Sequence, residues 1–458
     1  MKQKINKLEM YKLKFYIPLI IAVSMLLAVT LPVLGLPYCF NEVQLLGDSV
    51  FFMKNHGIGL VYNGSTVELP DLFSVIFALF ARFITTNPLV LHLIALALPA
   101  LMIYIAFQFG KFFFSVQGGV IAAAIMIVQN VFIAQSGLIL PNMMLNVCIL
   151  GGVFLFFREK YKGCTALMCA AALTDITGLV VAVYLLISYY NIKYREWKMK
   201  ENLWMGLPVL LWFVYQAISL GVCGMFSLRH CNFSFMNFAH NAWFIFIAQH
   251  RWAMTSVLLA VIAVNTVNKS MLYYVKEMAI KGAIIFGLIF ITDSIMSPDE
   301  SRCLVPISLM AIYTGCSIST LHTSYYSKYI IACAIMAATA LSVRQRDSVN
   351  DSYVNYKSQV KVDRKTADIL AARAKHYDQI LCDKYFNRIL TNSDYGYIDE
   401  YTPLKCMEGN HYYQWIIYSN HTTNAQVILE RENEDFEKKH TIYIGDYSDE
   451  IYRRKEGK

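Results

Sequence analysis

Three polar residues that could do chemistry follow directly after the first long apolar segment of the chain. Asn41 and Glu42 lie a few positions beyond residues 15–36, and Asp48 follows within two helical turns. A carboxylate near the end of a membrane segment is partly desolvated, which raises its pKa and suits it to general-base work. Glu42 is therefore a candidate base. The alternative is a solvated loop that simply carries charge.

Two charged residues further along the chain interrupt or border apolar segments. Asp175 stands in the sequence LTDITGLV, and a carboxylate inside an apolar stretch is costly and usually faces the interior of a helix bundle. Its alternative role is to cap the helix that follows. Arg302 begins an apolar segment, where an arginine can bind a phosphate through two parallel hydrogen bonds or can extend to the water interface.

Apolar segments dominate the chain. Of its 458 residues, 57% are hydrophobic and 16% are charged, whereas a soluble globular domain has about 25% charged residues. A helix that spans a membrane needs about 20 apolar residues. The sequence offers such segments at 15–36, 88–109, 117–134, 142–157, 203–223, 252–267, 281–297, 303–320 and 328–343.

The basic loops predict the orientation of these segments. Lysines crowd the N-terminus, which we therefore expect in the cytoplasm, together with the basic loops 158–162 and 193–200. The stretch 164–190 between these loops must cross twice or not at all. Two arms of about 12 residues reach only about 18 Å in a core about 30 Å thick, so we expect a short hairpin with its tip at 174–178. The alternative is one long tilted helix.

The predicted fold class is an all-α polytopic membrane bundle with a small α/β domain at its C-terminus. Counting the hairpin arms gives about eleven transmembrane segments in residues 1–344 and leaves residues 345–458 outside the cell membrane. The external loop 37–87 should carry interfacial helices, one of them starting at Pro70 and Asp71. The aromatic loop 224–251 is typical of a segment that lies on the membrane surface.

The tail has the alternating pattern of a small α/β domain. A helical run covers 367–386, and strand-like runs cover 412–419, 425–430 and 440–445. Cys382 and Cys406 are its only cysteines. In an external tail they can form a disulfide; otherwise they are two thiols.

Charge and cysteine patterns argue against two kinds of partner, nucleic acid and a metal held by the cysteines. The net charge of +8 comes largely from the basic loops of a membrane protein, so it does not indicate nucleic acid. The eleven cysteines show no CxxC pair and no metal-ligand spacing with histidine.

The order of these features resembles the GT-C membrane glycosyltransferases. The branch concerned is that of the protein O-mannosyltransferases and the aminoarabinose transferase of lipid A, which use dolichyl- or undecaprenyl-phosphate sugars. The resemblance covers roughly residues 15–340. It rests on FNE at 40–42, ELPDLFSVIFALFARF at 68–83, NPLVLHLIALALPAL at 87–101, AQSGLILPNMMLN at 134–146, LTDITGLV at 173–180 and SRCLVP at 301–306.

The chain departs from this family pattern at presumed site positions. Asn41 stands where the family has an aspartate, and Asn142 replaces the aspartate of a Pro-Asp pair. Asp175 stands where the family has a lysine, and Cys303 replaces the tyrosine that follows the arginine. These changes remove or invert charge, and an amide is no proton acceptor and a weaker metal ligand.

The resemblance implies the transfer of a sugar from a polyprenyl-phosphate-linked donor to a glycan, lipid or protein acceptor on the extracytoplasmic face. It implies catalytic roles for Glu42, Asn41 and Asp48, and substrate binding by Arg302, Asp175, Asn142, Pro70 and Asp71. A divalent cation is left open, because a single retained carboxylate is thin evidence for one. By the same resemblance, the location is a bacterial cytoplasmic membrane.

Two other functions stay open from the sequence. A catalytically degenerate GT-C-fold subunit or binding protein would explain Asn41, Asn142 and Asp175. A lipid or glycan transporter is a second alternative, although we find no internal repeat of the kind that transporters have.

Overall fold

The structure is a computed structural model. It describes residues 2–39, 41–57, 61–63, 66–68, 70–194, 204–224, 234–267, 273–296, 300–342, 353–375, 378–398, 404–407, 412–420 and 424–455.

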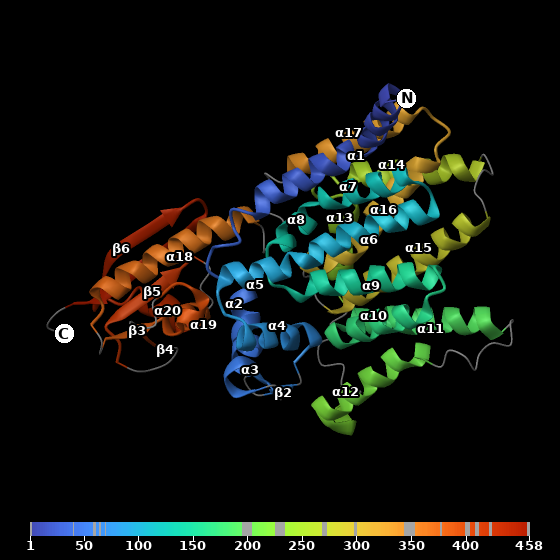
Figure 1. The fold of residues 1–458 in the computed structure, drawn as a ribbon. Coiled ribbons are helices and arrows are strands. Elements are labelled where there is room, and N and C mark those ends of the chain that lie inside the picture. The colour runs from blue at the N-terminus through green and yellow to red at the C-terminus, as the bar shows by residue number, and fades with distance from the viewer. Residues whose placement is uncertain are drawn as a thin grey trace. The chain divides into compact units, whose positions relative to one another are not determined.

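The chain forms two compact units, and each unit draws on separate parts of the sequence (Figure 1). Unit 1 comprises Met1–Leu31, Tyr62–Phe73 and Ala95–Asn350. Unit 2 comprises Pro32–Val61, Ser74–Ile94 and Asp351–Lys458. Much of the predicted external loop 37–87 therefore belongs to the same unit as the C-terminal tail.

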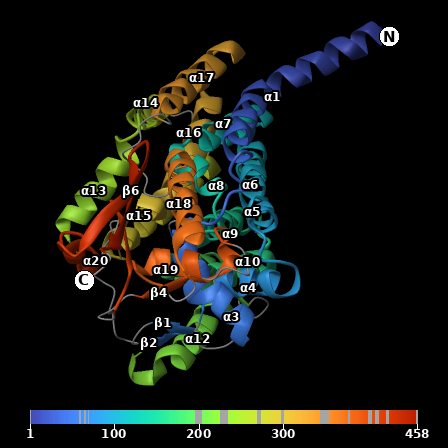
Figure 2. The same cartoon turned by 90° about the vertical axis from the view of Figure 1, so that its left-hand side faces the viewer.

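Unit 1 is a bundle of helices, and the predicted apolar segments coincide with most of them. Its helices are α1 (Lys2–Thr30), α6 (Ala97–Phe113), α7 (Val116–Ile127), α8 (Asn130–Ser136), α9 (Pro141–Phe157), α10 (Tyr161–Thr174), α11 (Ile176–Tyr194), α12 (Leu207–Gly224), α13 (Phe235–Phe246), α14 (Trp252–Val267), α15 (Tyr273–Met296), α16 (Leu304–Thr320) and α17 (Tyr325–Ser342). The first turns of α1 extend away from the other helices (Figure 2). The predicted surface segment 224–251 contains α13, which has apolar residues exposed along it.

Helix α7 lies at the centre of unit 1, in contact with α1, α6 and α16. Every residue from Gly118 to Ile127 is buried. Small residues make this possible: a Cβ at Gly119 would lie 2.4 Å from the Phe107 carbonyl oxygen, and one at Gly315 would lie 2.4 Å from the Ala122 main chain. Membrane helices pack closely where small residues meet in this way.

The predicted segment 117–134 is not one helix. Helices α7 and α8 are bent by 73° at the break between them. Gln129 stands at this break in an extended conformation, and its side-chain amide donates to the Ile125 carbonyl at 3.0 Å. A side chain thus satisfies a carbonyl that the interrupted helix leaves open.

The length of the described helices does not confirm the count of eleven spans. By length and composition, Pro88–Phe113 is the one described helix long and apolar enough to cross a membrane, and the bent pair α7 and α8 adds a second if it counts as one span. Eight shorter apolar stretches of the described residues, among them Pro141–Phe157 and Leu304–Thr320, do not meet this criterion.

Unit 2 combines the segment after α1 with the tail. Its helices are α2 (Asn41–Leu45), the π-helix η1 (Leu46–Val50), α3 (Phe51–His56), most of α4 (Leu72–Phe83) and α5 (Pro88–Ala95), then α18 (Tyr353–Arg373), α19 (Lys384–Thr391) and α20 (Ala425–Glu430). Helix α4 confirms a helix that starts just after Pro70 and Asp71.

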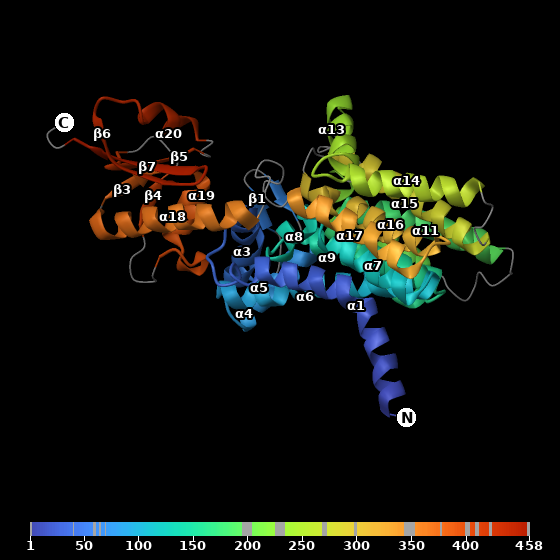
Figure 3. The same ribbon diagram turned by 90° about the horizontal axis from the view of Figure 1, so that it is seen from above.

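A five-stranded sheet forms the core of the tail. The strands are β3 (Gln379–Leu381), β4 (Lys405–Met407), β5 (Trp415–Ser419), β6 (Phe436–Ile444) and β7 (Tyr447–Arg454), in the order β4-β3-β5-β7-β6. Strand β3 is parallel to both neighbours, and β7 is antiparallel to both of its own. Helices α18 and α20 lie on opposite sides of the sheet (Figure 3).

The small α/β fold of the tail was predicted, but two of its elements were wrong. Residues 425–430 form helix α20 and not a strand, because Asn424 caps it by accepting a hydrogen bond from the Gln426 amide at 3.0 Å. The helix predicted at 367–386 ends at Arg373 and gives way to β3. Cys382 and Cys406 are not joined by a disulfide in the structure.

Two buried carboxylates connect α18 to the sheet. Asp449 on β7 accepts a hydrogen bond from Thr366 of α18 at 2.7 Å. Asp363 of α18 accepts one from the Tyr385 hydroxyl at 2.7 Å. Burial raises the pKa of Asp449 to about 6. Burial, followed by repulsion from Asp449, holds the pKa of Asp363 well above its usual value.

Because these pKa values are higher in the folded state than in the unfolded chain, the folded state binds more protons. Unit 2 should therefore lose stability as the pH rises from about 4 through the pKa of Asp449 near 6, and should lose more as Asp363 ionises. Replacing Asp449 with Asn keeps an acceptor for Thr366 and removes the charge. We expect Asp449→Asn to raise the free energy of unfolding at pH 7.5 by on the order of 2 kcal/mol and to flatten its pH dependence. Urea unfolding of the purified protein at several pH values measures this, with the exposed Asp368→Asn as control. Equal effects of both variants would contradict the prediction.

Candidate functional site

The chain reverses direction at Asp175, between α10 and α11. Asp175 has an extended backbone, and its Oδ1 accepts a hydrogen bond from the Thr177 amide at 2.8 Å. Gly178 allows the close approach of the two arms, because a Cβ there would lie 2.3 Å from the Ala171 main chain. The helical hairpin predicted in 164–190 is present and its tip lies within the predicted 174–178, but its arms of 14 and 19 residues are longer than the predicted arms of about 12. The capping role of Asp175 is confirmed as well.

Arg302 faces the same carboxylate. It lies in the short 3₁₀-helix Glu300–Cys303 that leads into α16, and its Nη1 is 3.4 Å from Asp175 Oδ2. The two side chains are 29% and 21% exposed, so a ligand could reach both. Two residues that the sequence singled out separately thus form one ion pair at the hairpin tip.

A buried carboxylate on α15 supports the tip. Asp293 is 3% exposed, and its Oδ1 accepts a hydrogen bond from the Thr177 hydroxyl at 3.1 Å. The next residue, Ser294, is hydrogen-bonded to Asn241 of α13 at 3.4 Å. We did not select Thr177 or Asp293 from the sequence, although a carboxylate inside an apolar stretch was a signal for the latter.

Asn142 lies in the first turn of α9, directly after Pro141, and is half-buried. One turn further on, Asn146 donates to the Ser308 hydroxyl of α16 at 2.9 Å. This contact joins the first half of α9 to the helix that follows Arg302. Pro70 and Asp71, just before α4, are half-buried.

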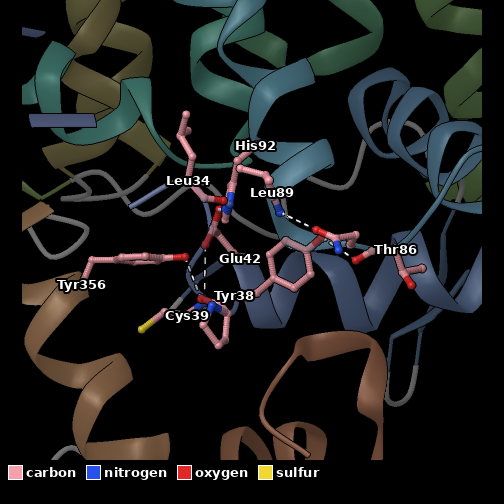
Figure 4. A network of polar contacts seen from close by, with 10 residues as sticks. Leu34, Tyr38, Cys39, Glu42, Thr86, Leu89, His92 and Tyr356 are labelled. Atoms are coloured by element: carbon pink, nitrogen blue, oxygen red, sulfur yellow. Dashed lines mark hydrogen bonds and ion pairs between the residues drawn. The ribbon is translucent and has the colours of Figure 1, made fainter. Parts of the chain in front are cut away.

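Glu42 belongs to unit 2, where it is fully buried against His92 of α5 (Figure 4). Glu42 Oε1 lies 3.1 Å from His92 Nε2, and the Cys39 amide donates to Glu42 Oε2 at 3.3 Å. His92 Nδ1 lies 2.9 Å from the Leu34 carbonyl oxygen. A carbonyl only accepts, so Nδ1 carries a hydrogen and donates it. His92 and Glu42 then share one further proton across their contact.

Two tyrosines enclose this pair. The Tyr38 ring lies edge-on to the His92 ring, with centroids 5.4 Å apart, and its hydroxyl donates to the Thr86 carbonyl. The Tyr356 hydroxyl donates to the Pro37 carbonyl at 2.7 Å. Burial, and then the charge of Glu42, hold the pKa of Tyr356 well above its usual value, so this phenol stays a neutral donor. Glu42 therefore anchors the segment after α1, and a role as base requires its contact with His92 to open.

Asp48 also lies in unit 2, and the tail holds it. It forms a short ion pair with Arg388 of α19, and Lys384 Nζ lies 3.5 Å from its Oδ1. A second ion pair has the opposite polarity: Lys54 of α3 supplies the cation and Asp394 of the tail supplies the carboxylate, at 2.7 Å. Asn41 starts α2, and its side chain lies outside the described residues.

No group of three or more His, Cys, Asp or Glu side chains that could hold a metal ion occurs within the residues that the structure describes. The candidate site residues in unit 1 centre on the Asp175–Arg302 pair, and those in unit 2 on the Glu42–His92 pair and the Asp48–Arg388 pair.

The bundle with its helical hairpin and α/β tail shares its fold with a protein of known structure, ArnT. Two solved structures that it resembles are those of ArnT from Cupriavidus metallidurans. In the apo state, that protein matches with a TM-score of 0.63 and 10% identity, over 95% of this chain and 97% of that chain. Bound to undecaprenyl phosphate, it matches with a TM-score of 0.59 and 10% identity, over 96% of this chain and 98% of that chain. No family model and no curated protein matches the sequence.

The close approach at Gly178 gives a test of the hairpin. Gly178→Ala places a methyl group against the Ala171 main chain, which cannot move without displacing the tip. We expect a loss of stability of about 2 kcal/mol, read as a lower midpoint in thermal unfolding of the purified protein. Gly287→Ala in α15 is the matched control, because a Cβ there meets nothing within 4 Å. A midpoint unchanged in Gly178→Ala would contradict the hairpin geometry.

Proposed function

We propose that this protein is a membrane glycosyltransferase that moves a sugar from a polyprenyl-phosphate donor to an acceptor on the extracytoplasmic face. The observation that carries the proposal is the ArnT-like fold over almost the whole chain, since one of these similar structures holds undecaprenyl phosphate. The fold also favours an integral membrane protein. We place it in a bacterial cytoplasmic membrane, with about eleven spans and residues 345–458 outside.

Arg302 is the proposed phosphate-binding residue. Its guanidinium has five N–H donors, and the contact with Asp175 at 3.4 Å involves one nitrogen, Nη1. The remaining donors suit a phosphate oxygen. Asp175 and, through Thr177, Asp293 would keep the tip beside Arg302 before the donor binds.

In the reaction, the acceptor hydroxyl attacks the anomeric carbon and the bond from that carbon to the phosphate oxygen breaks. The phosphate leaves with the electron pair, and a cation such as Arg302 offsets its growing charge. A base removes the proton of the attacking hydroxyl. Glu42 is the proposed base: when its contact with His92 opens, the shared proton stays on His92, and the free Glu42 carboxylate accepts the proton of the hydroxyl. Asp48, Asn142, Pro70 and Asp71 are proposed to shape the substrate site.

A second function has a specific observation in its favour. Glu42 is 1% exposed, and position 41 carries an amide. A chain that never exposes Glu42 would bind a lipid phosphate at Arg302 without transferring a sugar. Lipid binding and sugar transfer must therefore be measured separately.

Arg302→Gln should weaken binding of undecaprenyl phosphate by about tenfold or more, because a hydrogen bond to a charged group contributes about 1.5–3 kcal/mol. The affinity of Arg302→Lys for this lipid should lie between those of the unchanged protein and Arg302→Gln, since lysine keeps the charge and loses the planar donor pair. Titration of the purified protein with this lipid measures the effect, with the exposed Arg82→Gln as control. Unchanged affinity in Arg302→Gln would rule out the assignment.

Glu42→Gln should lower the rate of sugar transfer by about a hundredfold or more while lipid binding stays, if Glu42 is the base. Transfer from a radiolabelled polyprenyl-phosphate sugar measures the rate, and thermal unfolding measures stability in parallel. Full transfer by Glu42→Gln would overturn the role as base. A fall in the unfolding midpoint that accounts for the lost transfer would instead assign Glu42 to anchoring alone.

A further inference from the structure

A group of cations lies at the end of unit 1 opposite to the hairpin tip. Helix α10 runs from Tyr161 to Thr174, so the turn before it is one helix length away from Asp175 (Figure 1). This turn carries Arg158 and Lys160, and Lys162 follows at the start of α10; Lys111 lies near the end of α6. We call these four exposed residues the basic cluster.

The basic cluster stands on a layer of aromatic rings from two helices. Phe113 of α6 packs against Phe154 and Phe157 of α9, with ring centroids 6.2 and 5.7 Å apart. Phe109 joins the same layer, 5.1 Å from Phe113. The rings fix the ends of α6 and α9 against each other, so the cations above them have a rigid base.

Arg158 is held in place by this layer. Its guanidinium carbon lies 4.7 Å from the centre of the Phe112 ring and 5.5 Å from that of Phe154. Its turn is fixed by backbone bonds from the Glu159 amide to Phe156 and from the Lys160 amide to Leu155. A guanidinium that lies over a ring keeps the N–H groups along its edge available, in the geometry that matches a phosphate.

The basic cluster is not neutralised by carboxylates in the described part of the chain. Among the residues that the structure describes, none of its four members takes part in an ion pair. Glu159 is the single carboxylate in these turns. Two lysines, Lys111 over Phe107 and Lys281 over Phe156, extend the same arrangement of cation on ring.

An apolar stripe runs along α6 from the basic cluster. Leu101, Tyr104 and Phe112 are 45%, 57% and 51% exposed and lie on one side of this helix, because they are spaced by three and eight residues. A ligand with an anionic head and a long apolar chain fits cations that continue into such a stripe. A free phosphate or an acidic peptide would use only the cations.

We propose that the basic cluster and the α6 stripe form a binding site for an anionic membrane phospholipid, with its phosphate at Arg158 and an acyl chain along α6. The site depends on the membrane location proposed above and is separate from sugar transfer. It would hold the turns 111–116 and 158–161 at the headgroup level of the leaflet opposite to Arg302.

The test uses the full-length protein in nanodiscs of phosphatidylcholine with and without phosphatidylglycerol. Native mass spectrometry counts the retained phosphatidylglycerol. Each basic residue near a surface contributes about 1 kcal/mol to binding an anionic lipid, so Lys111→Gln, Arg158→Gln and Lys162→Gln together should reduce retention by about tenfold or more. Arg158→Lys alone should give a smaller loss, because it keeps the charge and loses the planar fork.

A charge-matched control changes three exposed lysines of α18, Lys357→Gln, Lys361→Gln and Lys365→Gln, and should retain the lipid as the unchanged protein does. Equal retention by both triple variants, or equal loss from both, would overturn the proposal. So would displacement of the lipid by inorganic phosphate at millimolar concentration, since that result identifies a free anion site. Thermal unfolding checks that the triple variant is folded. If its midpoint falls, Arg158→Lys decides the test, and full retention of the lipid by this variant and by Arg158→Gln alone would overturn the proposal.

Discussion

The two oxygens of the Asp175 carboxylate fix the part of unit 1 on which the candidate site depends. One oxygen caps α11 through the Thr177 amide, and the other faces Arg302 at 3.4 Å. A helix that ends inside an apolar bundle must satisfy its open amide groups from side chains. Asp175, which caps α11, therefore also carries the charge that positions Arg302. The Thr177 hydroxyl passes the constraint on to Asp293, so three separate segments share one polar network.

Solvent exposure differs between the proposed phosphate-binding residue, Arg302, and the proposed base, Glu42. Asp175 and Arg302 are open enough to meet a ligand, whereas Glu42 lies inside unit 2 with His92. A buried pair of this kind stabilises little by itself, but breaking it by removing one partner is costly. The contact therefore gives Glu42 a structural role that does not depend on transferase activity. A role of Glu42 as base would require a conformation in which the segment after α1 loosens.

The sequence predicted features that depend on local pattern and on length. The hairpin followed from the basic loops at both of its ends and from arms expected to be too short to span, although α11 has 19 residues. The roles of Asp175 as a cap and of Arg302 as the start of a helix followed from neighbouring residues. Contacts between residues far apart in the chain could not be predicted from the sequence. His92 gave no signal of its contact with Glu42, because the two lie in different segments and only packing joins them. Residues 425–430 were ambiguous, since a short apolar run fits a strand or a helix, and the cap at Asn424 decided between them. The bend at Gln129 was missed because its apolar neighbours read as one continuous span.

Unit 2 joins segments that are far apart in the chain, and this affects the order in which it can fold during synthesis. Asp48 pairs with Arg388, and Lys54 pairs with Asp394, in each case 340 positions later in the chain. At synthesis rates of about 5–20 residues per second, the segment after α1 waits roughly 20–70 s for these partners. During that time the Glu42 carboxylate lacks the cover of Tyr356, which is made almost as late. Residues made 340 positions later therefore complete the segment after α1, and a chain without α19 and Asp394 would leave Asp48 and Lys54 without these partners.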